Sequence, residues 1–209
     1  MYFRLGYYKL KLQDLLFFRS FSLDFEVIYA MGNKEFGLKI IGTPTEFGGT
    51  AELESFRFPN GKGFPESYKE FVLRYGYGLA LEEFHIYLPM GDYGDSIFIR
   101  TEEIRSTYID DVNNDDIWFD IEPDGSPELI KRLFPFASSD NGLYLFWDYE
   151  SRSENEIDIY ITDFRGIGFR NVGRSLYEAI ENLTGNRYKE FLPFSTQSLS
   201  RIFKCLNKG

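Results

Sequence analysis

The sequence contains one cysteine and one histidine, and these shortages exclude several kinds of site. Cys205 has no second cysteine with which to form an internal disulfide, so a reducing compartment such as the cytoplasm is expected. Together with His85 it leaves too few soft ligands for an ordinary structural zinc site. A histidine-dependent hydrolase triad would have to use His85, which stands in an apolar segment typical of a structural or surface histidine. The sequence therefore predicts no catalytic residue, no metal and no cofactor.

Long apolar runs and an excess of basic residues are also missing. The longest apolar run near the start, residues 15–18, ends at Arg19 and is far too short to span a membrane. The chain has 23 Lys and Arg against 33 Asp and Glu, which gives a formal net charge of −10 at pH 7. Such a charge repels nucleic-acid phosphates and anionic membrane surfaces, and it attracts basic partners. We therefore expect a cytoplasmic protein that binds neither nucleic acid nor membranes.

Aromatic residues, in contrast, are abundant. The chain has 22 Phe and 15 Tyr among 209 residues, enough to build one domain around a substantial core. Bulky rings suit half-buried pleated surfaces, so a substantial sheet with helices packed on it is expected. Residues 1–42 are aromatic and basic, and we interpret them as an N-terminal extension that packs on the domain, with Met31 as a candidate alternative start. Residues 43–209 are then a single domain with a C-terminal tail.

The clearest helix signal is the segment FPESYKEFVLRYGYG, residues 64–78. Pro65 suits a first helical turn because its missing N–H would be unpaired there, and Gly76 suits the residue that follows a helix. The apolar residues between them recur at i, i+3, i+4 and i+7, which predicts one buried stripe: Tyr68, Phe71, Val72 and Tyr75. Gly76 and Gly78 do not form a phosphate-binding loop, because the third glycine of that motif is missing and the segment follows a helix, not a strand.

Two further helices are predicted from their capping residues. Ser126 followed by Pro127 opens a short helix, and Ser175 with Glu178 three residues later forms a capping box. Thr101 is expected to cap another short helix.

Strands are expected where apolar residues alternate or cluster between turn residues. Four such segments stand out, at residues 84–90, 96–101, 143–149 and 156–164, and a fifth region, residues 25–42, resembles two short strands around a turn.

These segments, in this order, resemble the SUKH superfamily, which includes fungal cell-wall-assembly regulators and many bacterial immunity proteins. FPESYKEFVLRYGYG is similar to the family's signature helix. RLFPFASSDNGLYLFWDY, residues 132–149, is similar to its Pro-Phe, glycine and strand ending in aspartate. The segments IDIYITDF and SLYEAIENL match its final strand and serine-capped helix. The resemblance covers residues 43–184 and leaves both ends of the chain unexplained.

The resemblance implies an α+β fold, with a mainly antiparallel sheet packed with helices, and a role as a non-enzymatic protein-binding module. Bacterial members commonly neutralise a toxin, often a nuclease, so it implies an immunity protein, or antitoxin, of a polymorphic toxin system. One alternative is a regulatory scaffold that binds a host partner, like the fungal relatives. Another is a nucleotide-binding enzyme that uses GFRNVGRS, residues 168–175, although Arg174 stands where a Walker A loop has lysine.

The segment between Asp110 and Asp124, which we call the acidic segment, is rich in carboxylates and contains no Lys or Arg. It is open to three interpretations. A solvated loop is the usual role of a charge run, and a calcium loop would need a ligand spacing that DVNNDDIWFDIE does not keep. A recognition surface for a basic toxin is favoured by two aromatic residues among the carboxylates. The predicted partner-binding residues are Asp110, Asp111, Asp115, Asp116, Trp118, Phe119, Asp120 and Glu122.

Overall fold

A computed structural model describes residues 3–5, 8–10, 35–153 and 155–208, in two compact units. The first unit, residues 1–35, contains an antiparallel pair of strands, β1 (Phe3–Leu5) and β2 (Tyr8–Leu10). Met31 and most of the strand pair expected at residues 25–42 lie outside the described residues. The second unit begins at Phe36, before the expected boundary at residue 43. Phe36 is 2% exposed, and its ring stacks on that of Tyr177 at 4.1 Å, so the chain enters the core here.

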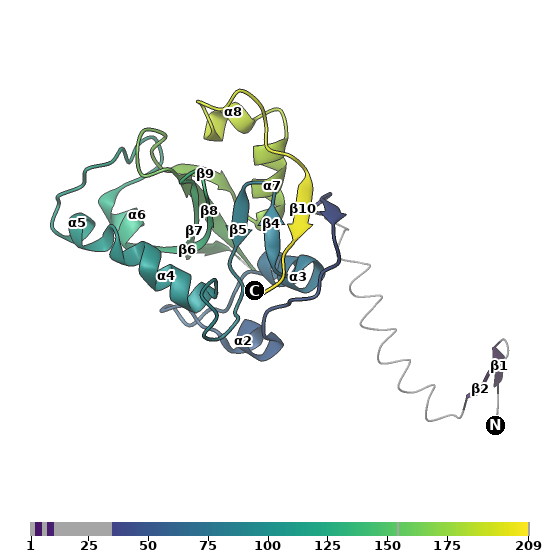
Figure 1. Ribbon diagram of the computed structural model, residues 1–209. Helices are drawn as coiled ribbons and strands as arrows, with labels where there is room; N and C mark the ends of the chain where they lie inside the picture. Colours follow the sequence, from purple (N-terminus) through teal and green to yellow (C-terminus); the bar gives the residue numbers. More distant parts are fainter. Residues whose placement is uncertain (1–2, 6–7, 11–34, 154, 209) are drawn as a thin grey trace. The chain divides into compact units, whose positions relative to one another are not determined.

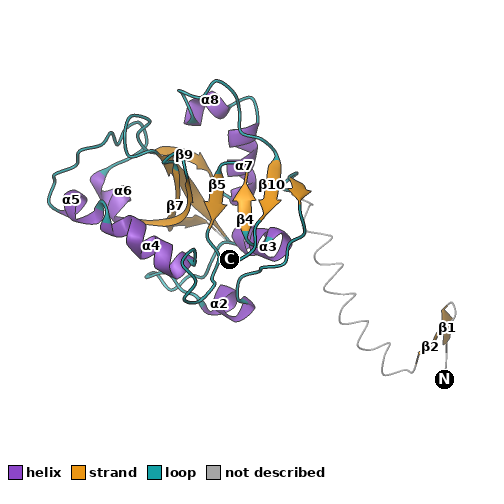
Figure 2. Cartoon of the chain, viewed as in Figure 1, coloured by secondary structure: helices purple, strands orange, loops and turns teal. Residues whose placement is uncertain are grey.

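The second unit is an α+β domain built on one eight-stranded sheet, as expected from the resemblance (Figures 1 and 2). The strand order is β3-β10-β4-β5-β6-β7-β8-β9, and every pairing is antiparallel except that of β10 with β3. The elements in chain order are β3 (Lys39–Ile41), α2 (Thr50–Ser55), α3 (Glu66–Tyr75), β4 (Gly78–Ala80), β5 (Phe84–Ile86), α4 (Ile97–Ser106), α5 (Ile109–Asn113), α6 (Pro127–Arg132), β6 (Leu133–Ser139), β7 (Tyr144–Ser153), β8 (Glu156–Thr162), β9 (Arg170–Gly173), α7 (Leu176–Thr184), α8 (Tyr188–Phe191) and β10 (Ile202–Cys205).

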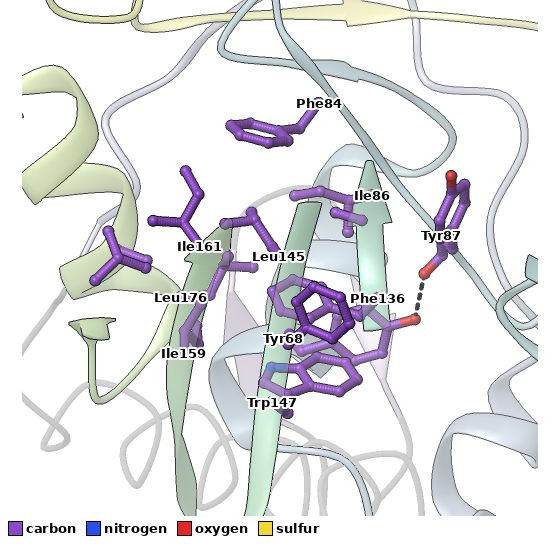
Figure 3. Close-up of a cluster of buried hydrophobic side chains, with 14 of the residues drawn as sticks. Tyr68, Phe84, Ile86, Tyr87, Phe136, Leu145, Trp147, Ile159, Ile161 and Leu176 are labelled. Atoms are coloured by element: carbon purple, nitrogen blue, oxygen red, sulfur yellow. Dashed lines mark hydrogen bonds between the residues drawn. The ribbon is translucent and has the colours of Figure 1, made fainter. Parts of the chain in front are cut away.

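Helices cover both faces of this sheet. On the first face, Tyr68 of α3 packs edge-on against Trp147 of β7 at 4.9 Å, and Leu176 of α7 lies in the same buried cluster (Figure 3). On the second face, α4 and the residues that follow it cover β6 and β7: Tyr108 contacts Phe146 at 6.1 Å. Side chains alternate between the two faces along each strand, so neighbouring residues of β7 belong to different layers.

The predicted helix at residues 64–78 is α3, and its two ends are fixed by specific residues. Pro65 is the N-cap, and the backbone N–H and hydroxyl of Ser67 donate to the Glu156 carboxylate of β8 at 3.0 and 2.6 Å. The Ser67 hydroxyl also accepts from the Leu176 N–H at 3.0 Å, so it joins α3, β8 and α7. Gly76 ends the helix with φ of 67°, and a Cβ there would lie 2.5 Å from the Glu46 carbonyl oxygen. Only glycine fits this turn.

Two more predicted helices are confirmed, with one difference in capping. The Ser126 hydroxyl accepts from the Leu129 N–H at 3.2 Å and starts α6. The Ser175 hydroxyl accepts from the Glu178 N–H at 3.2 Å and starts α7. The Glu178 carboxylate accepts from the N–H of Arg174, one residue before the expected Ser175, at 3.0 Å.

The strands predicted at residues 143–149 and 156–164 are β7 and β8, whereas the prediction for residues 96–101 is wrong. These residues form the first half of α4, and Thr101 lies inside this helix, where its hydroxyl donates to the Pro135 carbonyl at 2.9 Å. Ile97, Thr101 and Ile104 are the buried positions, and their spacing of four and three residues is helical. The β-branched residues of SIFIRT favour a strand, but packing against β6 stabilises the helix instead.

The expected C-terminal tail contains an interior strand of the sheet, β10. β10 lies between β3 and β4, with Phe203 opposite Ile40 on one side and Ala80 on the other. Phe203 is fully buried. A four-residue strand with one buried side chain gives too weak a periodic signal to be found by sequence pattern. Within the described part of the chain, none of the helices has the length and apolar character needed to cross a bilayer.

Candidate functional site

The acidic segment starts on α5 and continues as a loop to Asp124. α5 is anchored by Val112, which is fully buried, while Asp110, Asp115 and Asp116 are exposed. Asp111 is half-buried, and the remaining carboxylates of the segment are exposed: Asp120, Glu122 and Asp124. All of the predicted carboxylates are therefore exposed or half-buried.

The two aromatic residues of the acidic segment have different roles. Trp118 is 65% exposed, and its indole Nε1 donates to the Asp111 carboxylate at 3.0 Å. Phe119 is only 7% exposed and packs edge-on against Phe164 at 5.0 Å. We expected both rings to contact a partner, but in this structure Phe119 faces the core. Adjacent residues of an extended segment point to opposite sides, so one ring anchors the loop and the other is presented to solvent.

Hydrogen bonds hold the acidic segment against the loop between β8 and β9 and against the edge of β9. The Asp120 N–H donates to the Arg165 carbonyl at 3.1 Å, and the Asp124 N–H donates to the Phe169 carbonyl at 3.0 Å. The Asp124 carboxylate accepts from the N–H of Asn171 at 2.9 Å, which closes the outer edge of β9. A loop held in this way loses little conformational freedom when a partner binds.

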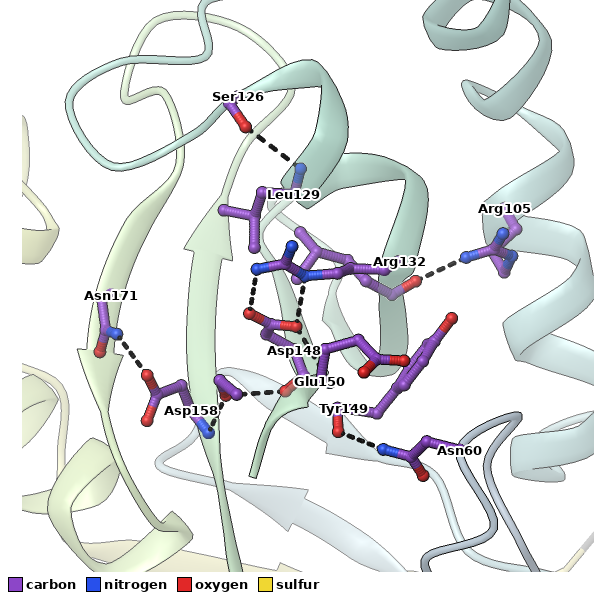
Figure 4. Close-up of polar contacts among 12 residues, drawn as sticks. Asn60, Arg105, Ser126, Leu129, Arg132, Asp148, Tyr149, Glu150, Asp158 and Asn171 are labelled. Atoms are coloured by element: carbon purple, nitrogen blue, oxygen red, sulfur yellow. Dashed lines mark hydrogen bonds and ion pairs between the residues drawn. The ribbon is translucent and has the colours of Figure 1, made fainter. Parts of the chain in front are cut away.

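The hydrogen bond between Asp124 and Asn171 leads from the acidic segment to a group of polar residues on the second face of the sheet. Figure 4 shows this group. Its centre is Asp148 of β7, which is 1% exposed and binds the Arg132 guanidinium through two hydrogen bonds of 2.7 and 2.8 Å. The hydrogen bonds to the Asp148 carboxylate raise the pKa of Arg132. Arg132 is the last residue of α6, and α6 is fixed in part because Arg105 of α4 donates to the Leu133 carbonyl at 2.6 Å.

Asp158 of β8 stands directly opposite Asp148 in the register of the two strands. Its carboxylate accepts a long hydrogen bond from the Asn171 amide at 3.4 Å. Burial raises the pKa of Asp158, and the Asp148 charge adds to this effect. Sequence patterns did not single out Asp158, because the pairing of the two aspartates is set by the strand register.

The residues proposed for a nucleotide site do not form a phosphate loop. Residues 170–173 of GFRNVGRS are β9 itself, an edge strand antiparallel to β8, whereas a Walker A loop follows a strand of a parallel sheet. Asp148, the aspartate that a Walker B strand would supply for magnesium, is already paired with Arg132. Across residues 3–5, 8–10, 35–153 and 155–208, no three His, Cys, Asp or Glu side chains are grouped so that they could hold a metal ion.

His85 lies on β5, opposite Ser138 of β6. Its Nε2 is 3.9 Å from the Asp140 carboxylate, while the Ser138 hydroxyl is 2.5 Å from the Tyr87 hydroxyl. The serine is thus engaged by a tyrosine, and the contacts do not form the hydrogen-bonded chain of a triad.

The fold is that of an α+β domain of the SUKH type: a capped α3 ending in glycine, a mainly antiparallel sheet, and a serine-capped α7. Residues 53–178 match the model of the SUKH_6 family, described as SMI1-KNR4 cell-wall. The match covers more than half of the chain, and the protein belongs to this family. Domains of the superfamily are generally non-enzymatic and bind protein partners. Comparisons with curated proteins and with solved structures gave no match.

Proposed function

We propose that this protein is an immunity protein that neutralises a basic bacterial toxin of the nuclease class by direct, non-enzymatic binding. The observation that carries the proposal is Trp118, an indole 65% exposed and oriented by a hydrogen bond from its Nε1 to Asp111 in a segment rich in carboxylates. Large aromatic residues ringed by polar groups are the usual energetic centres of protein interfaces.

The charge of the acidic segment supports a basic partner. Asp110, Asp115, Asp116, Asp120 and Glu122 are exposed, and no cation lies among them in the sequence. Enzymes that hold phosphate backbones carry clustered Lys and Arg, so an acidic surface complements their active sites. Complementary charge also accelerates association, which matters when a toxin must be captured before it acts.

The direct test uses the toxin encoded beside this protein. The purified toxin domain is assayed for nuclease activity while the immunity protein is added in increasing amounts. We expect complete inhibition near equimolar ratio. Full nuclease activity in the presence of excess protein, with no complex by size-exclusion chromatography, would refute the proposal.

The family description favours one alternative, a regulatory scaffold that binds a host partner, because it refers to cell-wall regulators. The two functions differ in the gene that supplies the partner. A toxin encoded next to this chain that is inhibited by it supports the immunity protein. A partner encoded elsewhere, whose own activity continues in the complex, supports the scaffold.

Trp118→Ala is expected to increase the dissociation rate of the toxin complex about 30-fold, because loss of a central aromatic anchor costs about 2 kcal/mol. The dissociation rate is measured by surface plasmon resonance. Phe47→Ala is the matched control, since Phe47 is also exposed, at 43%, and lies beside Gly76 at the end of α3, away from the acidic segment. Equal dissociation rates for wild type and Trp118→Ala would place the interface elsewhere.

The carboxylates of the acidic segment should affect the association rate constant. Asp115→Asn combined with Asp116→Asn is expected to slow association, and the loss should shrink as salt rises because exposed charges are screened. Asn tolerates the positive φ of 57° at residue 115, so the turn is kept. Glu52→Gln with Glu54→Gln on α2 removes the same charge elsewhere and should leave the association rate nearly unchanged.

The third prediction concerns nucleotides. Titration of ATP or GTP with Mg²⁺ in a calorimeter is expected to give no binding heat, because residues 170–173 are an edge strand. Micromolar binding that disappears in Arg174→Ala would instead support a nucleotide-binding enzyme.

A further inference from the structure

The second face of the sheet is not fully covered at β8 and β9. Asp158, Tyr160 and Asn171 are each half-buried there, beside the buried Asp148 and its partner Arg132. We call these five residues the polar sheet face. Figure 4 shows Asp158 and Asn171 turned toward each other on neighbouring strands, with the Arg132–Asp148 pair beside them.

Two carboxylates of this face oppose each other, and only one is neutralised. Asp148 and Asp158 are cross-strand partners, an arrangement in which like charges destabilise a sheet. The Arg132 guanidinium engages both oxygens of Asp148. Among the side chains that the structure describes, none forms an ion pair with Asp158; the Asn171 amide donates to its carboxylate at 3.4 Å, and the charge of Arg174 lowers its pKa. The Asp158 carboxylate is therefore half-buried and, among the described side chains, outside any ion pair.

The surroundings of Asp158 suit a flat cation better than a metal. Tyr160 is the next residue of β8 on the same face, and an aromatic ring beside a carboxylate binds guanidinium by stacking and by ion pairing. No metal-binding group of three or more side chains forms here or elsewhere in the described residues. Asp124 connects the face to the acidic segment, because its carboxylate accepts from the Asn171 N–H.

The geometry points to the polar sheet face as a second docking point for the protein partner, at which Asp158 receives an arginine side chain beside Tyr160. This inference rests on the proposed function for the identity of the partner, and it adds a recognition residue outside the acidic segment. Charge complementarity carries it: Asp158 forms no ion pair with a described side chain, and the Asn171 amide and the strand register hold its carboxylate on this face.

The test uses an N-acetylated, C-amidated hexa-arginine peptide and the full chain labelled with ¹⁵N. We expect the peptide to shift the amide resonances of Asp158, Tyr160 and Asn171 in low salt. Asp158→Asn, which keeps the size of the side chain, should weaken peptide binding about tenfold by fluorescence anisotropy, the loss expected for one charge-assisted hydrogen bond. Asp92→Asn, an exposed aspartate in the loop before α4, is the matched control and should change affinity less than about twofold.

The other outcomes separate the failure of this inference from the failure of the proposed function. Shifts confined to residues 110–124 would remove the polar sheet face from the interface and leave the proposed function intact. Shifts at Asp158 on addition of Ca²⁺ or Mg²⁺ alone would make the ligand a metal ion. Shifts at Asp158 with arginine peptide, in a protein that does not inhibit its toxin, would support this site and refute the proposed function.

A second measurement checks that Asp158 lacks a cation in the free protein. Burial, Asp148 and Glu178 raise the pKa of Asp158, while the Asn171 hydrogen bond and Arg174 oppose the shift. A carboxyl with a raised pKa in the folded state loses its stabilising contribution as pH rises through that pKa. Asp158→Asn should therefore unfold at a higher temperature than wild type at pH 7. The gain should shrink as the pH falls through the raised pKa and be absent below pH 3.8, the ordinary aspartate pKa. A lower unfolding temperature at pH 7 would contradict the inference.

Discussion

Phe203→Ala is expected to lower the free energy of unfolding by about 3–5 kcal/mol, as for other large-to-small substitutions of a buried ring. Phe203 is fully buried on β10, and its ring contacts Phe71 at 5.7 Å and Tyr75 at 5.2 Å. It also covers Gly78 of β4, where an added Cβ would lie 2.5 Å from the Phe203 ring. Since β10 joins β3 to β4, loss of this ring weakens both the core and the sheet.

Urea denaturation followed by circular dichroism measures this effect. Phe194→Ala is the control, because Phe194 is 76% exposed and its loss should change stability by less than about 0.5 kcal/mol. Comparable denaturation midpoints for Phe203→Ala and wild type would mean that residues 202–205 are a dispensable tail and not a strand of the core.

Arg132→Met is expected to cost about 3 kcal/mol, because it leaves the Asp148 carboxylate buried without its cation. The Asp148 side chain is 2% exposed and that of Arg132 is 40% exposed, so the arginine can be removed without a large cavity while the carboxylate cannot reach water. The pair also positions α6 on β7, since Arg132 is the last residue of that helix.

A double-mutant cycle measures the coupling between Arg132 and Asp148 separately from the effect of each single substitution. Asp148→Leu combined with Arg132→Met should cost clearly less than the sum of the two single variants, because an apolar pair leaves no unpaired charge. Single effects that add within about 0.5 kcal/mol would show that the two side chains are not coupled.

Local signals explain which parts of the fold could be predicted from the sequence. α3 is bounded by Pro65 and Gly76, whose conformational preferences act without distant contacts. Ser126 and Ser175 start α6 and α7 through hydrogen bonds within a few residues. The family resemblance added the α+β class and the order of the elements.

The parts that could not be predicted depend on distant contacts. α4 has strand-like composition, and only its packing on β6 shows the helical spacing of its buried residues. Which ring of Trp118 and Phe119 faces solvent depends on where Phe164 lies. The opposition of Asp148 and Asp158 is a matter of register between two strands. The acidic segment could be recognised from the sequence because its carboxylates are close together along the chain. The register between two strands is not visible there.

The position of β10 also determines when this domain can finish folding during synthesis. Phe203 pairs in parallel with Ile40, so the two ends of the domain's sequence must meet before the sheet is complete. Until residues 202–205 have emerged from the ribosome, β3 and β4 each lack a neighbouring strand, and the nascent chain exposes two unpaired edges. Contacts of such long sequence separation form slowly, and this sheet is completed only after residues 202–205 have left the ribosome.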